Sequence, residues 1–266
     1  MVDYSLIYKN LIESGYHVGT FDDFYNGEIG VTGDQLLNAA NLFKSTVSDL
    51  DRVYVYRHNY LDQNVKGYLT LPNYSGPSPS EEELLQEVSV SRISHRKKFI
   101  DDVIAGGGHR VRTTQQWYRL NLNGYDQIDE TISSNMYSMH SFFETLIKKF
   151  VKNIYSDLYQ SVEYDQLKCA TQLSIYKEGD FSDMHYDGIN PGRSCVIILY
   201  FADPNNYDDR SGGKLRIQHD HVDLTVDPIY GNYAMLDFSK WNISHSIEMV
   251  HGNFIRFALQ SFVGIW

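Results

Sequence analysis

The C-terminal part of the chain is a succession of short segments rich in β-branched and aromatic residues. Between residues 165 and 266 these segments run from LKCATQLSIYKEG to FIRFALQSFVGIW, and Gly, Asn, Asp and Pro separate them. Short segments of this composition, bounded by turn residues, are typical of β-strands. Because seven or eight of them follow one another, the pattern predicts a barrel or a jelly roll.

One of these segments indicates what surrounds the sheet. The run CVIILYF at residues 195–201 is apolar at almost every position instead of alternating with polar residues. A strand of this kind is covered on both faces. We therefore expect N-terminal helices to pack against the outside of the β-structure, which gives an α+β fold.

Helical patterns dominate the first 164 residues. We expect a first helix after Asp34. A second is expected between a capping box at Ser80 and a glycine stop at Gly106. A third is expected over residues 127–159, where apolar residues recur at helical spacing. AGGGHRVR (105–112) lacks the ending of a phosphate-binding loop and is better interpreted as a flexible connection. We predict a single domain, 1–266, with helical support in 1–164 and a β-core in 165–266.

The composition excludes several classes of protein. The net charge is −11 and the isoelectric point is near 5.3, which argues against a general nucleic-acid binder because such proteins need a basic surface. Cys169 and Cys195 lie in apolar segments, so we expect two buried thiols and no disulfide framework. No signal peptide and no apolar run of about 20 residues is found. We expect a soluble, cytoplasmic protein that uses no membrane.

The stretch DMHYDG places His185 and Asp187 two residues apart at a predicted strand. Side chains at i and i+2 of a strand point to the same side, so an imidazole and a carboxylate would lie side by side. His245, at the start of a later predicted strand, supplies a third donor. Two histidines and one carboxylate that leave coordination positions open form the facial triad of non-haem Fe(II) oxygenases. The alternative is a solvated polar pair at a strand end.

Other histidines compete with this set. His219 and His221 are also spaced two apart, but they lie where a hairpin turn is expected and lack a matching third ligand, so we interpret them as solvated turn residues. His251 precedes a predicted Gly-Asn turn, and we expect it to be exposed.

Arg256 lies inside the apolar segment FIRFALQSF. A buried arginine is costly unless it is paired, and no acidic residue nearby in the sequence supplies a partner. A bound dicarboxylate would pair with it through a bidentate contact. The alternatives are an edge arginine that reaches solvent and an ion pair with a distant carboxylate.

The ordered pieces YKEGDFSDMHYDG, SCVIILYF, SGGKLRI, VDPIYGNYAMLDF, SHSIEMV and FIRFALQSF together resemble the Fe(II)/2-oxoglutarate-dependent dioxygenases, and most closely their prolyl 4-hydroxylase-like branch. The resemblance covers about residues 165–266. It implies a double-stranded β-helix (jelly-roll or cupin-like) fold, with His185, Asp187 and His245 as iron ligands. It also implies that Arg256 binds the far carboxylate of 2-oxoglutarate and that Tyr176 lies near this cosubstrate.

One position departs from the family. Where the oxygen-sensing prolyl hydroxylases have a second tyrosine directed at that carboxylate, this chain has Phe201, with Tyr200 on the opposite face of the strand. The partner that would supply a hydroxyl group is therefore not assigned by the resemblance. Asp187 occupies a position at which the related halogenases have a small residue, so the resemblance implies a hydroxylase.

The resemblance implies an oxidoreductase that uses Fe(II), 2-oxoglutarate and O2, and allows for ascorbate as a reductant. We expect it to hydroxylate an unactivated C–H bond, in a prolyl residue or an amino-acid-like substrate, with release of succinate and CO2. The partner would be a small molecule or a peptide and no nucleic acid; the sequence predicts no oligomeric state. Alternatives are a non-catalytic jelly-roll module that binds peptide or carbohydrate, and a small-metabolite hydroxylase unrelated to proline. A nucleic-acid demethylase is disfavoured because no second arginine follows Arg256 in RFALQSF.

Overall fold

The computed structural model describes residues 2–25, 29–47, 54–59, 68–70, 113–121, 130–159, 162–163, 166–187, 193–219 and 222–265. The helices are α1 (Tyr4–Ser14), α2 (Asp22–Tyr25), α3 (Gly33–Val47) and α6 (Glu130–Ile154), with a short 3₁₀ turn at Pro204–Asn206. The strands of the first part are β1 (Tyr16–Thr20), β2 (Tyr54–Asn59), β3 (Tyr68–Thr70) and β4 (Thr113–Asn121). The strands of the second part are β5 (Lys168–Tyr176), β6 (Phe181–Tyr186), β7 (Arg193–Tyr200), β8 (Leu215–His219), β9 (Val222–Val226), β10 (Asn232–Asp237), β11 (Ser244–Ile247) and β12 (Arg256–Gly264).

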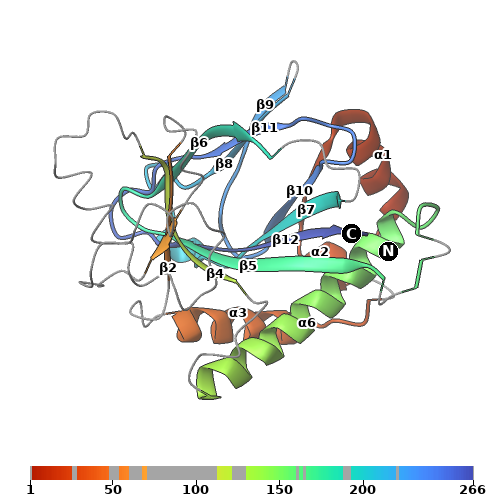
Figure 1. The fold of residues 1–266 in the computed structure, drawn as a ribbon, viewed down its shortest axis with the longest axis horizontal. Helices are drawn as coiled ribbons and strands as arrows, with labels where there is room; N and C mark the ends of the chain where they lie inside the picture. The colour runs from red at the N-terminus through yellow and green to blue at the C-terminus, as the bar shows by residue number, and fades with distance from the viewer. Residues whose placement is uncertain are drawn as a thin grey trace, which may run out of the picture.

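The strands from β5 to β12 form two antiparallel layers that face each other (Figure 1). One layer has the order β10-β7-β12-β5 and the other β6-β11-β8-β9. Consecutive strands alternate between the two layers except for the β8–β9 hairpin, which lies within the second layer. This is the topology of the double-stranded β-helix, so the predicted α+β fold is confirmed. The strand β4 pairs with both β5 and β6 and joins the layers on one side, while β1 extends the first layer beyond β10.

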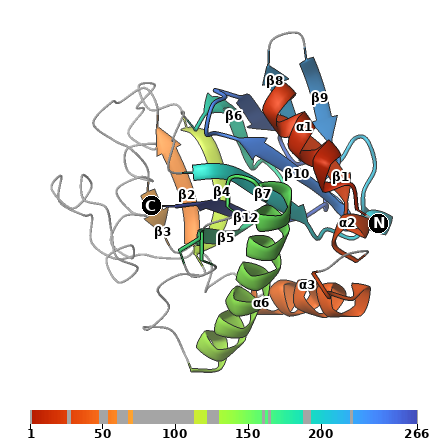
Figure 2. The same cartoon turned by 90° about the vertical axis from the view of Figure 1, so that its right-hand side faces the viewer.

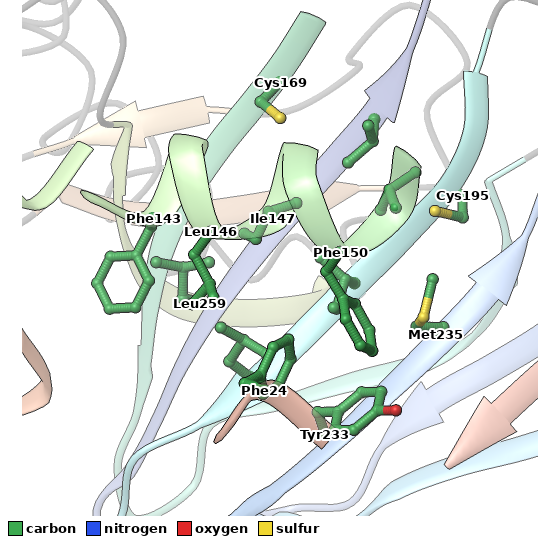
Figure 3. Packing of buried hydrophobic residues seen from close by; sticks show 14 of the residues in the cluster. Phe24, Phe143, Leu146, Ile147, Phe150, Cys169, Cys195, Tyr233, Met235 and Leu259 are labelled. Carbon is green, nitrogen blue, oxygen red and sulfur yellow. The ribbon is translucent and has the colours of Figure 1, made fainter. Parts of the chain in front are cut away.

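The helices cover the outer face of the first layer. In Figure 1, α3 and α6 lie beneath β5 and β12, and Figure 2 shows α1 alongside β1 and β10. Figure 3 shows Phe143, Leu146, Ile147 and Phe150 of α6 directed at the strands. Odd-numbered residues of the run 195–201 are buried in this outer core, and the even-numbered ones are buried in a second core inside the barrel. The prediction that this strand is covered on both faces is therefore confirmed.

The N-terminal part contains two of the three predicted helices and also strands that the sequence analysis did not anticipate. α3 begins close to the expected start after Asp34, and α6 falls within residues 127–159. The strands β1, β2, β3 and β4 interrupt the expected helical region, because they pair with one another or with distant strands of the barrel. The predicted helix between Ser80 and Gly106 and the connection at 105–112 lie outside the described residues.

Both cysteines are buried free thiols, as expected. Burial raises the pKa of Cys169 to about 12 and raises the pKa of Cys195 well above its ordinary value. At neutral pH both are therefore uncharged and unreactive. No helix among the described residues is long and apolar enough to cross a membrane.

Candidate metal centre

His185 and His245 lie directly opposite each other on the neighbouring strands β6 and β11. Their ring centroids are 4.3 Å apart, and Asp187 follows at the first position beyond β6. The Asp187 carboxylate lies 3.8 Å from His185 Nε2 through Oδ1 and 3.6 Å from His245 Nε2 through Oδ2. The structure thus brings together the three residues that the sequence singled out.

The ring nitrogens that face away from this cluster have their own neighbours. His185 Nδ1 lies 3.4 Å from Ser182 Oγ, and His245 Nδ1 lies 3.3 Å from the carbonyl oxygen of Ile243. Such contacts orient an imidazole and direct its other nitrogen toward a metal. Burial lowers the pKa of His245 well below its usual range, although the Asp187 carboxylate acts in the opposite direction. The imidazole is therefore neutral at pH 7, which is the form that binds a metal.

The three side chains fit a divalent transition metal. One donor atom from each residue lies within 4.8 Å of the other two, so one ion can lie between them. Two imidazoles and one carboxylate suit iron and leave further positions for other ligands. Among the described residues no other group of three or more His, Cys, Asp or Glu side chains could share an ion. Tyr186, between two of the three, is 59% exposed and points away from the cluster.

Arg256 is completely buried, with 0% of its surface exposed. None of its three guanidinium nitrogens has a hydrogen-bond partner among the described residues. The rings of Tyr176 and Tyr200 lie 4.7 and 5.2 Å from the guanidinium carbon, so the charge lies between two aromatic side chains inside the barrel. The structure thus excludes an edge arginine that reaches solvent, and no ion pair with a described carboxylate is present. An unpaired buried guanidinium suits a carboxylate ligand.

The second tyrosine beside Arg256 is Tyr200, one residue before position 201, where the resemblance to prolyl hydroxylases placed it. Phe201 points outward and packs against Phe21, Phe43 and Phe143 of the outer core. Tyr200 points inward, and its hydroxyl group is buried without a hydrogen-bond partner among the described residues. Burial raises the pKa of Tyr200 to about 12, although the Arg256 charge acts in the opposite direction, so the phenol keeps its proton. The tyrosine beside Arg256 inside the barrel is therefore Tyr200, and position 201 is an outer-core residue.

The order of the strands explains why these residues meet. Tyr176 is paired with Arg256 across β5 and β12, and Ala258 is paired with Tyr200 across β12 and β7. A signal for Tyr200 existed in the sequence, since it shares the face of Val196 and Ile198 by strand alternation. Strand alternation alone could not show which face points into the barrel, because both faces of this strand are apolar.

The SGG sequence before β8 forms a turn beside Arg256. Gly212 has φ +64°, and a Cβ atom there would lie only 2.0 Å from the carbonyl oxygen of Met249. At Gly213, with φ +72°, a Cβ atom would lie 3.5 Å from the Arg256 Cδ atom. Both positions favour glycine, because the chain adopts a left-handed conformation and passes very close to its neighbour.

The competing histidines are placed elsewhere. β8 and β9 form the expected hairpin, but His219 is not solvated, because its ring lies half-buried with its edge toward Trp241 at a centroid distance of 4.9 Å. His221 lies outside the described residues. His251 is exposed next to the turn at Gly252, as expected.

Comparison with known proteins agrees with this fold. No family model and no curated protein matches the sequence. Among solved structures, the chain resembles a prolyl-4-hydroxylase of Pseudomonas putida, with a TM-score of 0.55, 12% identity and 98% of each chain covered. It also resembles a 2OG-Fe(II) oxygenase family oxidoreductase of Burkholderia pseudomallei, with a TM-score of 0.54, 10% identity, and 99% of this chain and 92% of the other covered.

A third similar structure is a prolyl hydroxylase of Trichoplax adhaerens in complex with a hypoxia inducible factor peptide fragment. Its TM-score is 0.53 at 12% identity, with 98% of this chain and 89% of the other covered. The fold is therefore the one found in 2OG-Fe(II) oxygenases, including prolyl-4-hydroxylases. The resemblance noted in the C-terminal motifs is confirmed at the level of the fold, and it extends over nearly the whole chain.

Proposed function

We propose that this protein is an Fe(II)- and 2-oxoglutarate-dependent oxygenase that hydroxylates an unactivated C–H bond. The observation that carries the proposal is the presence, in one barrel, of two unusual groups. One is the cluster of His185, Asp187 and His245, whose donor atoms lie within 4.8 Å of one another. The other is Arg256, a fully buried guanidinium without a hydrogen-bond partner among the described residues.

Each group has a separate task in this proposal. His185, Asp187 and His245 would hold the iron, and Arg256 with Tyr200 would bind the far carboxylate of 2-oxoglutarate, while Tyr176 packs beside it. When bound, iron and 2-oxoglutarate supply the oxidising chemistry, with O2 as oxidant and succinate and CO2 as products. The apolar side chains of the barrel interior exclude water, which strengthens the contact between Arg256 and a carboxylate. Ascorbate is a candidate reductant that keeps the iron active.

A non-catalytic jelly-roll module does not account for both groups. Such a module has no need of an unpaired buried cation, which costs several kcal/mol unless a ligand compensates it. For the substrate, we propose a prolyl residue in a peptide, or an amino-acid-like molecule. The support is the similarity to prolyl hydroxylases, one of which was solved with a peptide fragment.

The proposal is tested by measuring succinate formation. Protein purified without oxygen is incubated with Fe(II), 2-oxoglutarate, ascorbate and O2, with and without a panel of proline peptides and free amino acids. We expect succinate from the unaltered protein, and a substrate product whose mass is increased by one oxygen. His185→Ala and His245→Ala should form no succinate, because each removes one of three iron ligands.

A matched control uses a histidine outside the cluster. His251→Ala removes an exposed imidazole and should leave both iron binding and succinate formation unchanged. Equal succinate formation by His185→Ala and the unaltered protein would contradict the proposal. So would iron binding, measured by metal analysis after dialysis, that does not depend on His185 and His245.

A further inference from the structure

Two glutamines face each other inside the barrel. They lie on β5 and β12, the same two strands that carry Tyr176 and Arg256, but away from these two residues along each strand. Gln172 on β5 is paired with Gln260 on β12, and the Nε2 group of Gln172 donates a hydrogen bond to Oε1 of Gln260. By strand alternation they share the inner face with Tyr176 and Ala258, which belong to the interior core. The Gln pair is therefore a polar group in an otherwise largely apolar wall.

Burial decreases along this wall in the direction away from Arg256. Arg256 and Ala258 on β12 are fully buried, whereas Gln260 and Phe262 are only half-buried. The same change occurs on β5, from Tyr176 at 1% exposure to Gln172 at 6% and a half-buried Ala170. The inner face is thus fully buried around Arg256 and partly exposed near Phe262, and the Gln pair lies between the two.

Two ring contacts connect the partly exposed Phe262 with the metal cluster. The ring of Phe262 stacks on Phe238 at a centroid distance of 6.4 Å, and Phe238 lies 6.1 Å from the ring of His245. Phe238 therefore lies between Phe262 and His245 of the candidate metal centre. Because Gln260 precedes Phe262 by one position on the same face of β12, we expect a molecule that reaches the metal from the side of Phe262 to meet the amides of Gln172 and Gln260.

The hydrogen bond between the two amides uses only part of their capacity. Each amide has two N–H donors and one carbonyl acceptor, so the pair keeps the Gln172 oxygen and the Gln260 NH2 group for other partners. No other hydrogen bond of these two side chains to a described residue is present. One donor and one acceptor held side by side are complementary to an amide, which presents one acceptor and one donor. On β7 and β12 the inner-face neighbours Ile198, Ala258 and Phe262 carry no charge, while on β4 Asn121 is paired with Gln172 and Arg119 with Ser174.

We propose that Gln172 and Gln260 are the substrate-recognition element of the site, and that they bind an uncharged amide group such as a peptide bond. The inference rests on the proposed function only for the position of the reacting carbon, which would lie beyond the amide toward the metal. It favours a prolyl residue within a peptide over a free amino acid, whose carboxylate and ammonium groups find no partner in the Gln pair.

The test measures binding of N-acetyl-L-prolinamide, which carries an amide on each side of the proline ring, and of free L-proline. Dissociation constants are determined by NMR titration of the protein with Zn(II) and 2-oxoglutarate present, so that no turnover occurs. We expect Gln172→Leu and Gln260→Leu to weaken binding of the blocked probe roughly five- to tenfold, the effect of one lost hydrogen bond. Calorimetric titration should find unchanged binding of Zn(II) and 2-oxoglutarate.

Two further variants separate recognition from folding. Gln260→Glu keeps an acceptor for the Gln172 amide but removes the NH2 donors, so it should fold and still bind the probe weakly. Gln218→Leu changes a glutamine on the outer face of β8, which bonds only to Asp223 among the described residues, and should bind the probe like the unaltered protein.

The outcomes are distinguishable. Unaltered binding of the blocked probe by the Gln172 and Gln260 variants, absence of binding by the unaltered protein, or tighter binding of free L-proline would overturn the inference. If the protein bound neither Zn(II) nor 2-oxoglutarate but held the blocked probe through the two glutamines, the inference would stand and the proposed function would be wrong.

Discussion

Among the described residues, two charged side chains of the barrel strands have no exposed surface, Asp237 at the end of β10 and Arg256 at the start of β12, and their surroundings differ completely. The Asp237 carboxylate accepts hydrogen bonds from Tyr155 Oη at 3.1 Å, from Ser239 N at 2.7 Å and from Ser239 Oγ at 2.6 Å. Arg256 has none among the described residues. Asp237 is thus satisfied by the fold itself, whereas Arg256 is not.

This difference separates a structural charge from a ligand-binding one. Tyr155 follows α6 directly, so its bond to Asp237 fastens the end of that helix to the barrel. A buried charge whose hydrogen bonds the protein itself supplies needs no ligand, whereas a buried charge without partners reduces stability until a ligand binds. Substitutions at the two positions should therefore change different measurements.

The largest expected effect is on cosubstrate binding by Arg256→Met. The change removes the guanidinium but keeps most of the side-chain volume, and it should weaken 2-oxoglutarate binding at least roughly 100-fold, or about 3 kcal/mol. The free energy of unfolding should stay the same or increase, because an unpaired buried charge is removed. Calorimetric titration with 2-oxoglutarate and urea denaturation measure the two effects. A variant that is strongly destabilised would show that Arg256 has a structural partner.

The opposite pattern is expected for Tyr155→Phe. Loss of one hydrogen bond to a buried carboxylate should lower the free energy of unfolding by about 1.5–3 kcal/mol. Binding of 2-oxoglutarate should not change, since Tyr155 lies outside the barrel interior. Urea denaturation checks the first effect and calorimetry the second. Weaker 2-oxoglutarate binding together with full stability would invalidate the distinction between the two charges.

A smaller effect is expected when one hydroxyl group is moved between adjacent residues. Tyr200→Phe should weaken 2-oxoglutarate binding about fivefold, or about 1 kcal/mol, because it removes the phenol beside Arg256. Phe201→Tyr places a hydroxyl group among the outer-core aromatic rings and should lower the free energy of unfolding without changing 2-oxoglutarate binding. The assignment of Tyr200 would be wrong if Phe201→Tyr were the variant that changed 2-oxoglutarate affinity.

The smallest effect is a pH dependence of stability that arises from Asp237. Burial raises the pKa of Asp237 in the folded protein, although the bonds from Ser239 and Tyr155 act in the opposite direction. The folded state therefore holds the proton more tightly, and the associated stability is present below the unfolded pKa of about 3.9 and lost as the pH rises through the folded pKa. The free energy of unfolding relative to Asp237→Asn should accordingly decrease from pH 4 to pH 7 in urea denaturation. An increase over this range would indicate that the hydrogen bonds outweigh burial.

Local periodicity was sufficient to predict some parts of the site and insufficient for others. His185 and Asp187 were recognisable because strand alternation puts neighbours at i and i+2 on one side, and Arg256 because a cation interrupts an apolar strand. Tyr200 could not be assigned, because both faces of its strand are buried and only the pairing with Ala258 places it inside. The additional strands, β4 above all, depend on pairing with β5 and β6, which are distant in the sequence.

The Gly212–Gly213 turn has a consequence for the order of events in the proposed reaction. It runs beside Arg256, since a Cβ atom at Gly213 would lie 3.5 Å from the Arg256 Cδ atom, and Arg256 itself has no exposed surface. Phe262, on the same face of β12, is half-buried. In the proposed reaction we therefore expect 2-oxoglutarate to bind at Arg256 before a substrate binds near Phe262, and succinate to leave after the modified substrate. Steady-state kinetics with both substrates varied would test this order.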